Sequence, residues 1–597
     1  MKSLKKIVLF TTAFAFFCCK AQDGNKKVVT KPQNHNTDHW VASDALGREV
    51  TTFEEAGVVK DNKTIGVFYY VWHGYHSKKV YNITEILKEP KGKRKWGPKG
   101  KFHFWGEPEQ GYYRAEDPWV LRRDLQMLTN AKVDFIYLDV TNHFIYPETV
   151  HALFQMGAQM RKEGIPTPDI TFTTNSKSGS TVTKIYNEFY KKGLYKDQWF
   201  MWQGKPLIMA NPKDKELTQE ARDFFIIKYS WAWTNTKKEP NHWQWLDTYP
   251  QDYGWTKDSL TPEQIPVSVA GHPGRSKDDN FGNSRSKGKQ PTINKDYLTE
   301  FTGQGLHFQE QWDRALEVNP EVVMVTQWNE WLAQRFIWGE KEWQKKENAL
   351  YAGYPIKKGE SWFVDVFTEE FNRDMAPMKG GHTDNYYYQL MSNIRKYKGM
   401  TAPIKFSQDA KIKIDGNFED WTTVQPEFYD PTGDTMHRNF AGYDPETMYA
   451  NKTGRNDIML SKVGLSETDV FFYAKTQNQL TSYKDDKWML LFIDSDKDIT
   501  TGWEGYDYVI NYEVLSSKAS TLKKWNGTTW IYVGKVAYKT NKNELELRLS
   551  KKDLGVKENA DFHFKWADNP IELTDVTTFF MNGDTAPDRR FKYHFRQ

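Results

Sequence analysis

Cysteine is almost missing from this chain: of 597 residues, two are cysteine, Cys18 and Cys19. Both lie within the first 21 residues, so a folded protein without that segment has no thiol. Disulfide bonds, thiolate nucleophiles and cysteine-ligated zinc are therefore excluded from the folded part. Stability has to come from a hydrophobic core instead, and the 15% aromatic residues supply large apolar side chains for it.

Long apolar runs are also lacking. The longest, residues 7–17, is too short to span a bilayer but follows three lysines, which is the pattern of a signal-peptide core. We expect residues 1–21 to be a signal peptide cleaved after Ala21, and the protein to be exported: periplasmic, secreted or associated with the outer membrane of a Gram-negative bacterium. The alternative is a lipid anchor attached at Cys18 or Cys19. No integral membrane segment is expected.

Net charge is small as well. The formal charge of +4 comes from the four lysines of residues 1–21, and from residue 22 onward 78 basic residues balance 78 acidic ones. Binding to nucleic acid requires a basic excess, so nucleic acid is not expected as the partner. The balance conceals two unlike halves. Residues 409–597 carry 25 basic and 30 acidic residues, and residues 22–408 hold the matching excess of five positive charges.

The first half of the chain has the pattern of repeated strand–helix units. Residues 22–60 are polar and predict a linker, but from residue 64 onward short apolar runs alternate with stretches of helical periodicity. The eight apolar runs are residues 65–71, 133–138, 170–173, 207–210, 224–229, 267–270, 322–326 and 363–367. Buried strands alternating with amphipathic helices are typical of parallel βα units. Eight of them predict an α/β fold, a (β/α)8 TIM barrel over residues 61–402.

The pattern changes beyond about residue 403. Short runs of alternating character are separated by turns rich in Asn, Gly and Asp. Among these runs are residues 470–476, 488–493, 508–514, 530–536 and 544–549. Such runs are typical of antiparallel sheets. We therefore predict a β-sandwich over residues 409–597.

Polar and aromatic residues gather at three of the expected strand ends. They are Trp72 and His73 after the first run, Asp139 at the end of the second, and Trp328, Asn329, Glu330 and Trp331 after the seventh. In a barrel of this kind, chemistry lies at the C-terminal ends of the strands. Apolar walls raise the pKa of a carboxyl group and suit it to acid–base work, while tryptophan faces stack on sugar rings.

The Trp-Asn-Glu-Trp turn carries a resemblance to a known group of enzymes. Together with residues 68–70, 363–365 and 386–388, it resembles the barrel of glycoside hydrolase families 71 and 99 over residues 60–400. In family 99 the glutamate of this turn acts as a base on the neighbouring sugar hydroxyl, which implies that role, or that of a nucleophile, for Glu330. The family places its acid glutamate three residues later, where this chain has Ala333. Because glycoside hydrolysis normally needs two carboxylates, another strand must supply the second one or the reaction differs.

Asp139 is the first candidate for the second carboxylate, because it ends an apolar strand where a neutral side chain would be usual. The alternative is a structural carboxylate that caps a loop through Thr141 or Asn142. Asp247, Glu310 and Asp365 are weaker candidates, with Glu310 expected on a solvated helix face.

For Glu330 itself, the structural alternative is a buried ion pair with Arg335.

The expected substrate contacts are the histidines and tryptophans near the strand ends: Trp72, His73, Trp233, His272, Trp328, Asn329 and Trp331. Trp231 and Trp233 form a stacking platform in this interpretation, with a packed barrel rim as the alternative. His73 and His76 have no third ligand at a recognisable spacing, so no zinc site and no catalytic cofactor are expected.

Two basic loops bear on the charge of the substrate. Residues 91–101 contain several lysines without an acid, and residues 275–289 add Arg285, Lys287 and Lys289. Both loops follow expected strand ends and would overhang the site. A basic rim of this kind favours sulfated or uronate-containing glycans, with plain solvated loops as the alternative.

The C-terminal half resembles the family 9 carbohydrate-binding modules. The resemblance rests on residues 414–421 and on residues 491–508, in that order, and runs from about residue 411 to the end. Such modules often carry calcium, and Asp494, Asp496 and Asp498 alternate as ligands of a hard cation would. Ile499 stands where a calcium loop of the EF-hand type has glycine. The expectation is a structural Ca²⁺ at these three residues, or else a solvated acidic turn.

These patterns together predict an exported glycoside hydrolase that degrades a polysaccharide or oligosaccharide, with an anionic algal or plant glycan favoured. The alternatives are a glycan-binding protein without turnover, built on a barrel that lost its acid, and a polysaccharide lyase.

Overall fold

The computed structural model describes residues 36–597 except 233–235, 272–281, 294–296, 342–343, 345–348, 408–409 and 557–558. The expected signal peptide, Cys18, Cys19 and the first part of the linker lie outside the described residues. Within the described ranges, no helix is both long and apolar enough to cross a membrane. The residues described below belong to one compact unit, Pro32–Gln597.

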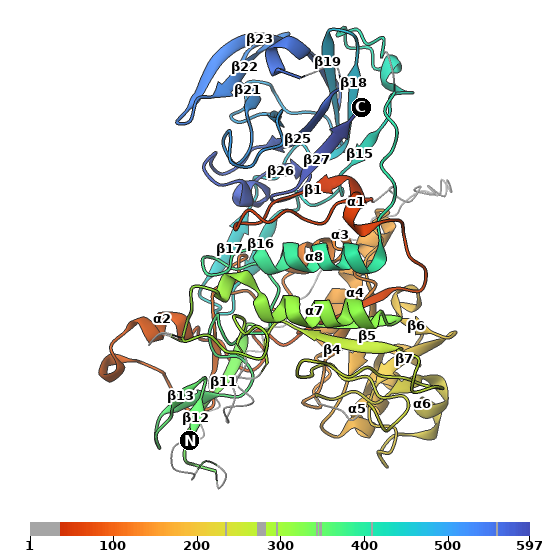
Figure 1. Ribbon diagram of the computed structural model, residues 1–597, viewed down its shortest axis with the longest axis vertical. Helices are drawn as coiled ribbons and strands as arrows, with labels where there is room; N and C mark the ends of the chain where they lie inside the picture. Colours follow the sequence, from red (N-terminus) through yellow and green to blue (C-terminus); the bar gives the residue numbers. More distant parts are fainter. Residues whose placement is uncertain are drawn as a thin grey trace, which may run out of the picture. The chain divides into compact units, whose positions relative to one another are not determined.

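Seven parallel strands form the central sheet of the first half, in the order β8-β7-β5-β4-β2-β10-β9 (Figure 1). Their bounds are β2 Thr64–Tyr69, β4 Phe135–Asp139, β5 Asp169–Thr173, β7 Lys205–Met209, β8 Ile226–Lys228, β9 Gln264–Ser268 and β10 Val322–Trp328. The short β6 (Met201–Trp202) adds to β7 in antiparallel orientation. All seven residues of β10 are buried, as expected for a parallel strand that is covered on both faces.

Helices connect these strands, which confirms the predicted alternation of strands and helices except between β8 and β9, where no helix lies among the described residues. They are α2 Ile83–Lys88, α3 Pro118–Asn130, α4 Pro147–Lys162, α5 Ser178–Ile185, which continues as a π-helical turn, α6 Gln219–Phe224 and α7 Leu306–Val318. A last helix, α8 (Asn385–Lys398), lies beside α7 in Figure 1. The N-terminus of α3 shows why the chain starts a helix there: Pro118 occupies the first turn and Asp117 Oδ1 accepts from Trp119 N at 3.0 Å.

An eighth parallel strand is not found in the described part of the chain. Residues 363–367 were expected to supply it, but β14 (Ser361–Phe363) pairs antiparallel with β11 (Leu332–Ile337), which also pairs with β3 (Phe102–Phe104). A short apolar run does not specify the direction in which it pairs, and here the neighbouring chain is the strand that follows Glu330. β10 and β2, the seventh and first expected strands, therefore pair directly with each other, without the expected eighth strand between them.

The two outer parallel strands, β8 and β9, do not pair with each other. The chain segment between them forms bridges next to both strands. Isolated bridges join Tyr229 to His242 and Gly254 to Gln264. Lys228, at the end of β8, forms a buried ion pair with Glu263 at 2.9 Å, just before β9. Irregular chain thus stands where a closed barrel would have a further strand ladder, and a complete eight-stranded barrel is not established.

The second half of the predicted linker is folded. Residues 36–60 contain β1 (Trp40–Val41) and α1 (Phe53–Ala56), and β1 pairs with β27 at the other end of the chain. Trp40 is buried against Phe591 and Tyr593. The tether predicted from the polar composition of residues 22–60 is therefore wrong for residues 36–60, because the pairing of β1, the buried Trp40 and the ion pair of Asp38 with Lys132 fix the segment to the rest of the fold.

The C-terminal half is a large antiparallel sheet and not the two separate sheets of a sandwich. Its twelve strands follow the order β1-β27-β25-β20-β21-β22-β23-β24-β19-β18-β15, with β26 on β25. The bounds are β15 Glu427–Tyr429, β18 Ile458–Leu465, β19 Asp469–Thr476, β20 Leu490–Asp494, β21 Tyr508–Ser516, β22 Ala519–Trp525, β23 Trp530–Asn541, β24 Glu544–Ser550, β25 Asp561–Asp568, β26 Asp584–Ala586 and β27 Lys592–Arg596. The five strands expected at residues 470–549 are confirmed.

This sheet curls so that distant strands face each other. Phe472 of β19 lies 5.9 Å from Phe562 and 5.5 Å from Phe564 of β25, although five strands separate β19 from β25 in the sheet order. The strands enclose a core as the two layers of a sandwich do, which explains why the alternating pattern suggested one. What the pattern does not show is that the hydrogen-bonded ladder is continuous.

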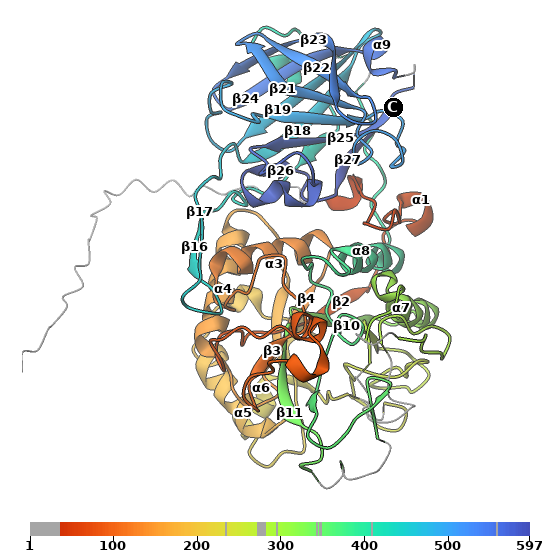
Figure 2. The same cartoon turned by 90° about the vertical axis from the view of Figure 1, so that its left-hand side faces the viewer.

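Helix α3 and a hairpin connect the two halves. Arg122 and Arg123 of α3 donate to the carbonyl groups of Thr432 and Asp434 in the second half. The hairpin of β16 (Arg438–Ala441) and β17 (Met448–Asn451) runs from the large sheet alongside the first half (Figure 2). A further hairpin, β12 (Leu350–Tyr351) and β13 (Tyr354–Pro355), lies near β14 in the sequence.

Candidate active site at the strand ends

Glu330 follows β10 directly and is buried, with 2% of its side chain exposed. Arg373 Nη2 donates to both of its carboxylate oxygens, at 3.2 Å for Oε1 and 3.1 Å for Oε2. Arg373 is buried as well, and its Nε donates to Gln327 Oε1 at 3.1 Å. A carboxylate and a guanidinium taken out of water together are costly unless they hydrogen-bond, and this pair does.

Arg335 is not the partner of Glu330, so the predicted structural ion pair is wrong. Arg335 lies on β11, where its Nε donates to Ser361 Oγ and its Nη1 to Gly97 O, both at 2.8 Å. Sequence reasoning missed Arg373 because it lies 43 residues beyond Glu330 in an irregular segment. The one signal available was its place a few residues after the last expected strand, as the one basic residue in a short segment that also contains Glu369, Glu370 and Asp374.

Asn329 locks the ends of β10 and β2 together. Its Oδ1 accepts from Tyr70 N at 2.7 Å and its Nδ2 donates to Tyr70 O at 3.1 Å. Its backbone is left-handed, with a φ of 62°, a conformation that asparagine adopts more readily than most residues. Gln327 Nε2 also donates to Tyr70 Oη at 2.8 Å. Asn329, expected to contact substrate, uses its side chain to position the turn that carries Glu330.

Asp139 ends β4 and is buried next to the first strand end. Trp72 Nε1 donates to its Oδ2 at 3.1 Å, while Thr141 donates to Oδ1 from its backbone N at 3.1 Å and from Oγ1 at 2.7 Å. The loop cap through Thr141 that the sequence offered as the structural alternative is therefore present. The bond from Trp72 comes from a different strand, which orients the carboxylate toward the site shared by β2 and β4.

Asp365 is the third carboxylate of the site and the most accessible one, with 48% of its side chain exposed. Its Oδ1 lies 3.8 Å from Arg373 Nη2, and its carbonyl oxygen accepts from Arg373 Nη1 at 3.0 Å. The sequence ranked Asp365 among the weaker candidates. The structure brings it to the same guanidinium as Glu330.

The electrostatics of the three carboxyl groups are coupled. Burial raises the pKa of Glu330 to about 8, against the lowering effect of Arg373, and the charges of Asp365 and Asp139 raise it further. Burial also raises the pKa of Asp139, opposed by the hydrogen bonds from Thr141 and Trp72. Burial and the nearby charge of Glu330 raise the pKa of Tyr70 well above its usual value, so Tyr70 stays neutral. Carboxyl groups whose pKa values are shifted by burial and by neighbouring charges are suited to acid and base roles.

Trp328 and Trp331 do not present their faces to a ligand. Both are 0% exposed. Trp331 stacks on Trp105, with ring centres 4.8 Å apart, and Trp328 meets the edge of Tyr387 at 6.0 Å. Their expected role in sugar stacking is not compatible with this packing. The two indoles form the apolar wall that removes Glu330 from water.

Trp245 is the tryptophan that packs against the guanidinium group of Arg373, and it was not among the residues expected from the sequence. The guanidinium carbon of Arg373 is 5.9 Å from its ring centre, and Phe68 of β2 is at 5.3 Å. Trp231, which the sequence suggested as part of a stacking platform, meets Trp245 edge-on at 5.9 Å. Trp233 and His272 lie outside the described residues.

His73 is buried between Trp72 and Tyr113, whose rings are 5.9 Å and 5.3 Å away. Burial lowers its pKa to about 4, so the imidazole is neutral at physiological pH. A ring enclosed in this way does not reach substrate hydroxyls. Trp72 serves the site through its hydrogen bond to Asp139, and His76 is the histidine of this turn with partial exposure.

The remaining acid candidates have structural partners. Glu310 of α7 forms a buried ion pair with Arg285 at 2.6 Å, so it is not on a solvated face and Arg285 is not a cation of the rim. Asp247 accepts from Gln244 at 2.6 Å and from Asp252 N at 2.9 Å. Both carboxylates therefore form structural interactions with neighbouring segments.

The basic loop of residues 91–101 runs directly into β3, which pairs with β11 just beyond Glu330. Lys91 and Lys99 are ion-paired with Glu360 and Glu340, each at 2.5 Å. Lys93, Lys95 and Lys101 are exposed. The loop therefore brings exposed positive charge to the same end of the sheet as the carboxylates. Ala333, at the position of the missing acid, is buried in β11 opposite His103.

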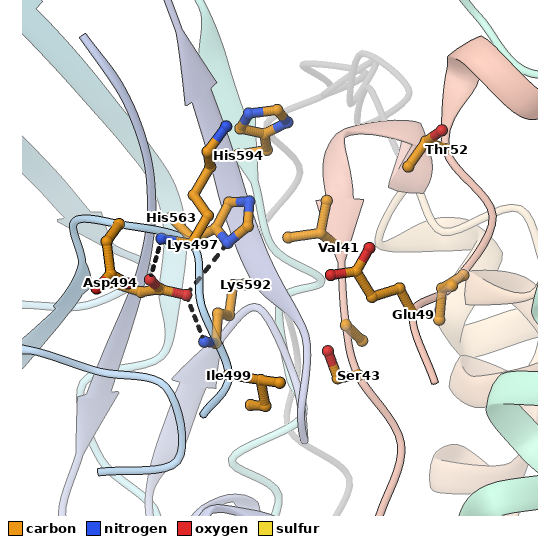
Figure 3. Close-up of a pocket in the computed structure, with 13 residues that line it drawn as sticks. Val41, Ser43, Glu49, Thr52, Asp494, Lys497, Ile499, His563, Lys592 and His594 are labelled. Carbon is orange, nitrogen blue, oxygen red and sulfur yellow. Dashed lines mark hydrogen bonds and ion pairs between the residues drawn. The ribbon is translucent and has the colours of Figure 1, made fainter. Parts of the chain in front are cut away.

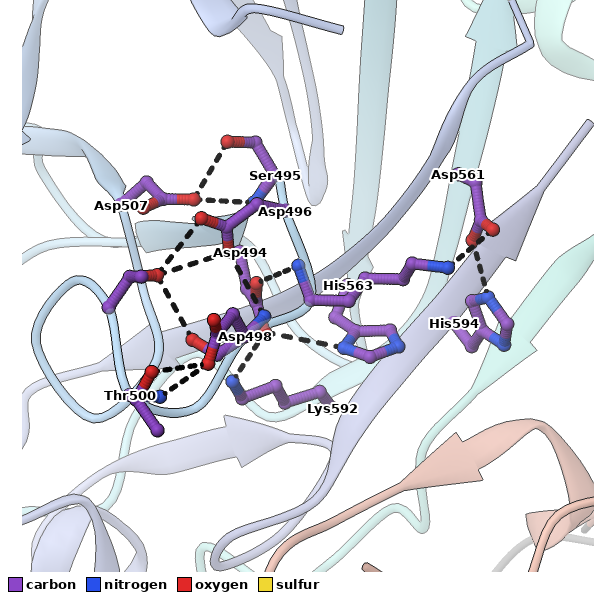
Figure 4. Close-up of polar contacts among 12 residues, drawn as sticks. Asp494, Ser495, Asp496, Asp498, Thr500, Asp507, Asp561, His563, Lys592 and His594 are labelled. Atoms are coloured by element: carbon purple, nitrogen blue, oxygen red, sulfur yellow. Dashed lines mark hydrogen bonds and ion pairs between the residues drawn. The ribbon is translucent and has the colours of Figure 1, made fainter.

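The acidic loop expected to bind calcium already has protein partners for its carboxylates (Figure 4). Asp494 Oδ2 accepts from Lys592 Nζ at 2.8 Å and from His563 Nδ1 at 3.3 Å. Asp496 accepts from Thr501 Oγ1, and Asp498, which is exposed, accepts from Thr500. An oxygen from Asp494 and one from Asp496 do lie within 4.8 Å of each other and of Asp507, whereas Asp498 is not part of that group.

A cavity of about 330 Å³ opens beside this loop, where residues 41–52 face the large sheet (Figure 3). It is lined by Glu49, Lys497, His563 and His594, among others. Its ionisable groups are largely paired, since His594 Nε2 lies 2.7 Å from Asp561 Oδ1. Burial lowers the pKa of His563 to about 4. The cavity thus holds internally paired charges, unlike the site in which Glu330 and Asp365 share Arg373.

The sequence matches no protein-family model and no curated protein. Among solved structures, the chain is similar to the GH99 endo-α-mannosidase from Bacteroides thetaiotaomicron at 15% identity, over 56% of this chain and 98% of that one, with a TM-score of 0.30. For the same enzyme in complex with Bis-Tris propane, the identity is 14% over 57% of this chain and 98% of that one, with a TM-score of 0.30. For a glycoside hydrolase-like protein, the identity is 10% over 56% of this chain and 95% of that one, also with a TM-score of 0.30. Similarities this weak do not show a family or an activity for this chain.

Proposed function

We propose that this protein is an exported glycoside hydrolase that degrades a polysaccharide by carboxylate acid–base catalysis. The observation that carries the proposal is the site around Glu330. A buried carboxyl group with a raised pKa shares one guanidinium with a second, accessible carboxylate, and a third lies at the neighbouring strand end. Two acids at one arginine, with a third at the neighbouring strand end, are suited to moving a proton.

In this mechanism Glu330 is the general acid. With a pKa of about 8 it holds its proton at neutral pH and can deliver it to the glycosidic oxygen as that bond breaks. Arg373 then stabilises the carboxylate that remains. Asp139, which hydrogen bonds from Trp72 and Thr141 hold in place, acts as base or nucleophile on the sugar. These roles reverse those implied by the sequence resemblance, because burial raises the pKa of Glu330 to about 8 and so favours its protonated form.

The scaffold in this proposal is a variant of the (β/α)8 barrel, in which the chain between β8 and β9 replaces a strand ladder. The bridges of Tyr229 to His242 and Gly254 to Gln264 support it. The large antiparallel sheet is proposed as a glycan-holding module. Export is supported by the N-terminal lysines and apolar run of residues 1–21.

The exposed lysines of the loop before β3 favour an anionic glycan. Lys93, Lys95 and Lys101 would meet sulfate or carboxylate groups of a bound chain at the rim of the site. The proposal is tested by incubating the purified protein with matched anionic and neutral polysaccharides and measuring new reducing ends. Release from the anionic glycans alone supports both parts of the proposal. Release from neutral glycans alone rejects the charge preference, and binding without release rejects hydrolysis.

Asp139→Asn should lower kcat/KM by about 100-fold or more, because an amide neither takes a proton nor attacks carbon. Asp365→Asn removes the accessible carboxylate instead and should change kcat/KM less, mainly through substrate binding. Steady-state kinetics of the two variants on the best glycan distinguishes these roles. If the larger loss belongs to Asp365→Asn, then Asp365 and not Asp139 is the second catalytic group.

The activity should fall above about pH 8. Glu330 must be protonated to act as the acid, and its pKa is raised to about 8, so kcat/KM should fall about tenfold per pH unit beyond that value. Arg373 lowers this pKa, so Arg373→Met should move the alkaline limb to higher pH while reducing the maximum rate. A profile of kcat/KM from pH 5 to 10 for both proteins checks this. An alkaline limb that stays in place in Arg373→Met would show that another group titrates.

A further inference from the structure

A second cluster of carboxylates lies far from Glu330 in the sequence, in the loops of the large sheet. Asp430 follows β15, Asp434 lies four residues further on, and Asp584 begins β26. One carboxylate oxygen from each lies within 4.8 Å of the other two. Each of the three residues is at most 2% exposed. The acids thus meet in the protein interior, where bulk water does not screen their charges.

The protein satisfies these carboxylates only in part: Ile458 N and Thr585 N donate to the two oxygens of Asp584, but one oxygen of each of the other two acids has no donor among the described residues. Asp430 Oδ2 and Asp434 Oδ1 have no hydrogen-bond donor among the described residues, and neither has Oδ1 of the neighbouring Asp457. The opposite oxygen of Asp434 accepts from Gln126 Nε2 at 3.1 Å, and that of Asp457 from Gly433 N at 2.7 Å. A buried polar atom without a partner costs about 1–3 kcal/mol, and a charged one more. Three such oxygens in one place therefore call for a ligand.

The charges around the cluster do not balance either. Asp457 and Asp588 add to the three acids, and their repulsion and burial raise the pKa of Asp434 to about 8. Two cations face them: Arg123 Nη1 lies 3.9 Å from Asp588 Oδ1, and Lys565 donates to the carbonyl of Pro587. The nearby Arg122, Arg589 and Lys592 have acids of their own in Glu163, Glu109 and Asp494. Among the described residues, these acids therefore outnumber the cations that are not already paired elsewhere.

We propose that Asp430, Asp434 and Asp584 bind a calcium ion. The cluster offers only oxygen ligands, without histidine or cysteine, which suits a hard cation. The ligands come from separate loops at irregular spacing, and Ca²⁺ accepts six to eight oxygens in flexible geometry where Mg²⁺ demands a near-ideal octahedron. The site differs from the loop of Asp494, Asp496 and Asp498, none of whose carboxylate oxygens is both buried and without a donor among the described residues.

The ion would hold the large sheet against helix α3. Gln126 of α3 donates to Asp434 and, at 2.7 Å, to Asp588, and Arg123 donates to the carbonyl of Asp434 at 2.8 Å. The same helix leads into β4, which ends at Asp139. Calcium bound to these loops therefore fixes the contact between the two halves without touching the proposed catalytic groups.

The test uses the full-length protein, stripped of metal with a chelator and examined without any glycan. Calorimetric titration with Ca²⁺ should show a saturable site, and Ca²⁺ should raise the thermal midpoint far more than the same concentration of Mg²⁺. Asp434→Asn should lose most of this shift. Because it relieves repulsion, it should be at least as stable as the wild type in chelator and less stable in Ca²⁺. The control, Asp496→Asn with Asp498→Asn, should keep the full shift.

Two results would overturn the site. One is a wild-type midpoint that Ca²⁺ does not change relative to chelator. The other is a shift that survives in Asp434→Asn and disappears in the Asp496 and Asp498 control, which would move the calcium to the exposed loop. If Asp434→Asn does not fold, Asp584→Asn and the Ca²⁺ content of the wild-type protein by elemental analysis decide the question. Less than one tightly held ion per chain after dialysis against micromolar Ca²⁺ contradicts the proposal.

Discussion

Glu330→Gln should lower kcat/KM for the polysaccharide by about 100- to 10,000-fold, the range usual for loss of a general acid. Glutamine keeps the volume of the side chain, and its carbonyl still accepts from Arg373, so the fold should be retained. It has no proton to give. Steady-state release of reducing ends measures the loss, and thermal unfolding confirms that the variant is folded.

The chain offers a matched control for this variant. Glu310 is also paired with an arginine, Arg285, at 2.6 Å, but it lies on helix α7 and not at the end of a parallel strand. Glu310→Gln should therefore affect stability and leave kcat/KM within about threefold of the wild type. If both variants lose activity equally, the loss comes from breaking a buried ion pair, and Glu330 has no special chemical role.

Arg438→Met should destabilise the protein by about 3–5 kcal/mol, the cost of leaving a buried charge without its partner. Asp117, which caps α3, is fully buried and accepts from Arg438 Nε at 2.9 Å and Nη2 at 2.7 Å. The guanidinium also lies 4.9 Å and 4.1 Å from the ring centres of Trp119 and Tyr449. Denaturant unfolding, followed by fluorescence, measures the change in free energy.

A surface ion pair provides the comparison. Arg596 and Glu54 lie 3.0 Å apart with more than half of each side chain exposed. Arg596→Met should change the free energy of unfolding by less than about 1 kcal/mol. Equal effects of Arg438→Met and Arg596→Met would mean that the hairpin β16–β17 does not hold the two halves together through Asp117.

The strands and helices of this protein were largely predictable from local pattern. Seven of the eight expected strands of the first half form one parallel sheet, since each is an apolar run between turn signals. The pairing partners were not predictable. Residues 361–363 pair antiparallel with β11, and Trp40 joins a sheet whose other edge is formed hundreds of residues later. Such contacts depend on which strand edges are still unpaired once the other elements have packed. The periodicity of the sequence does not contain that information.

Part of the candidate site was also predictable from the sequence, and part was not. Glu330 and Asp139 were found from strand ends, because the topology of parallel sheets brings those ends together. Arg373 was not found, although it opposes the rise that burial causes in the pKa of Glu330. The tryptophans were assigned from residue type alone, and burial separates them: Trp328 and Trp331 form walls, whereas Trp72 binds Asp139. The residue type shows which interactions a tryptophan side chain can form, but only its exposure in the fold shows whether its ring is accessible to a ligand.

The central claim is that the protein hydrolyses a glycosidic bond with Glu330 as the acid. Its most direct test is digestion of the best polysaccharide in ¹⁸O-labelled water, with the products examined by mass spectrometry. Hydrolysis predicts that each new reducing end from the wild type carries one ¹⁸O, and that Glu330→Gln yields almost no such product. Chains that bind but stay intact, or products that end in an unsaturated sugar without the label, would contradict it and show a binding protein or a lyase.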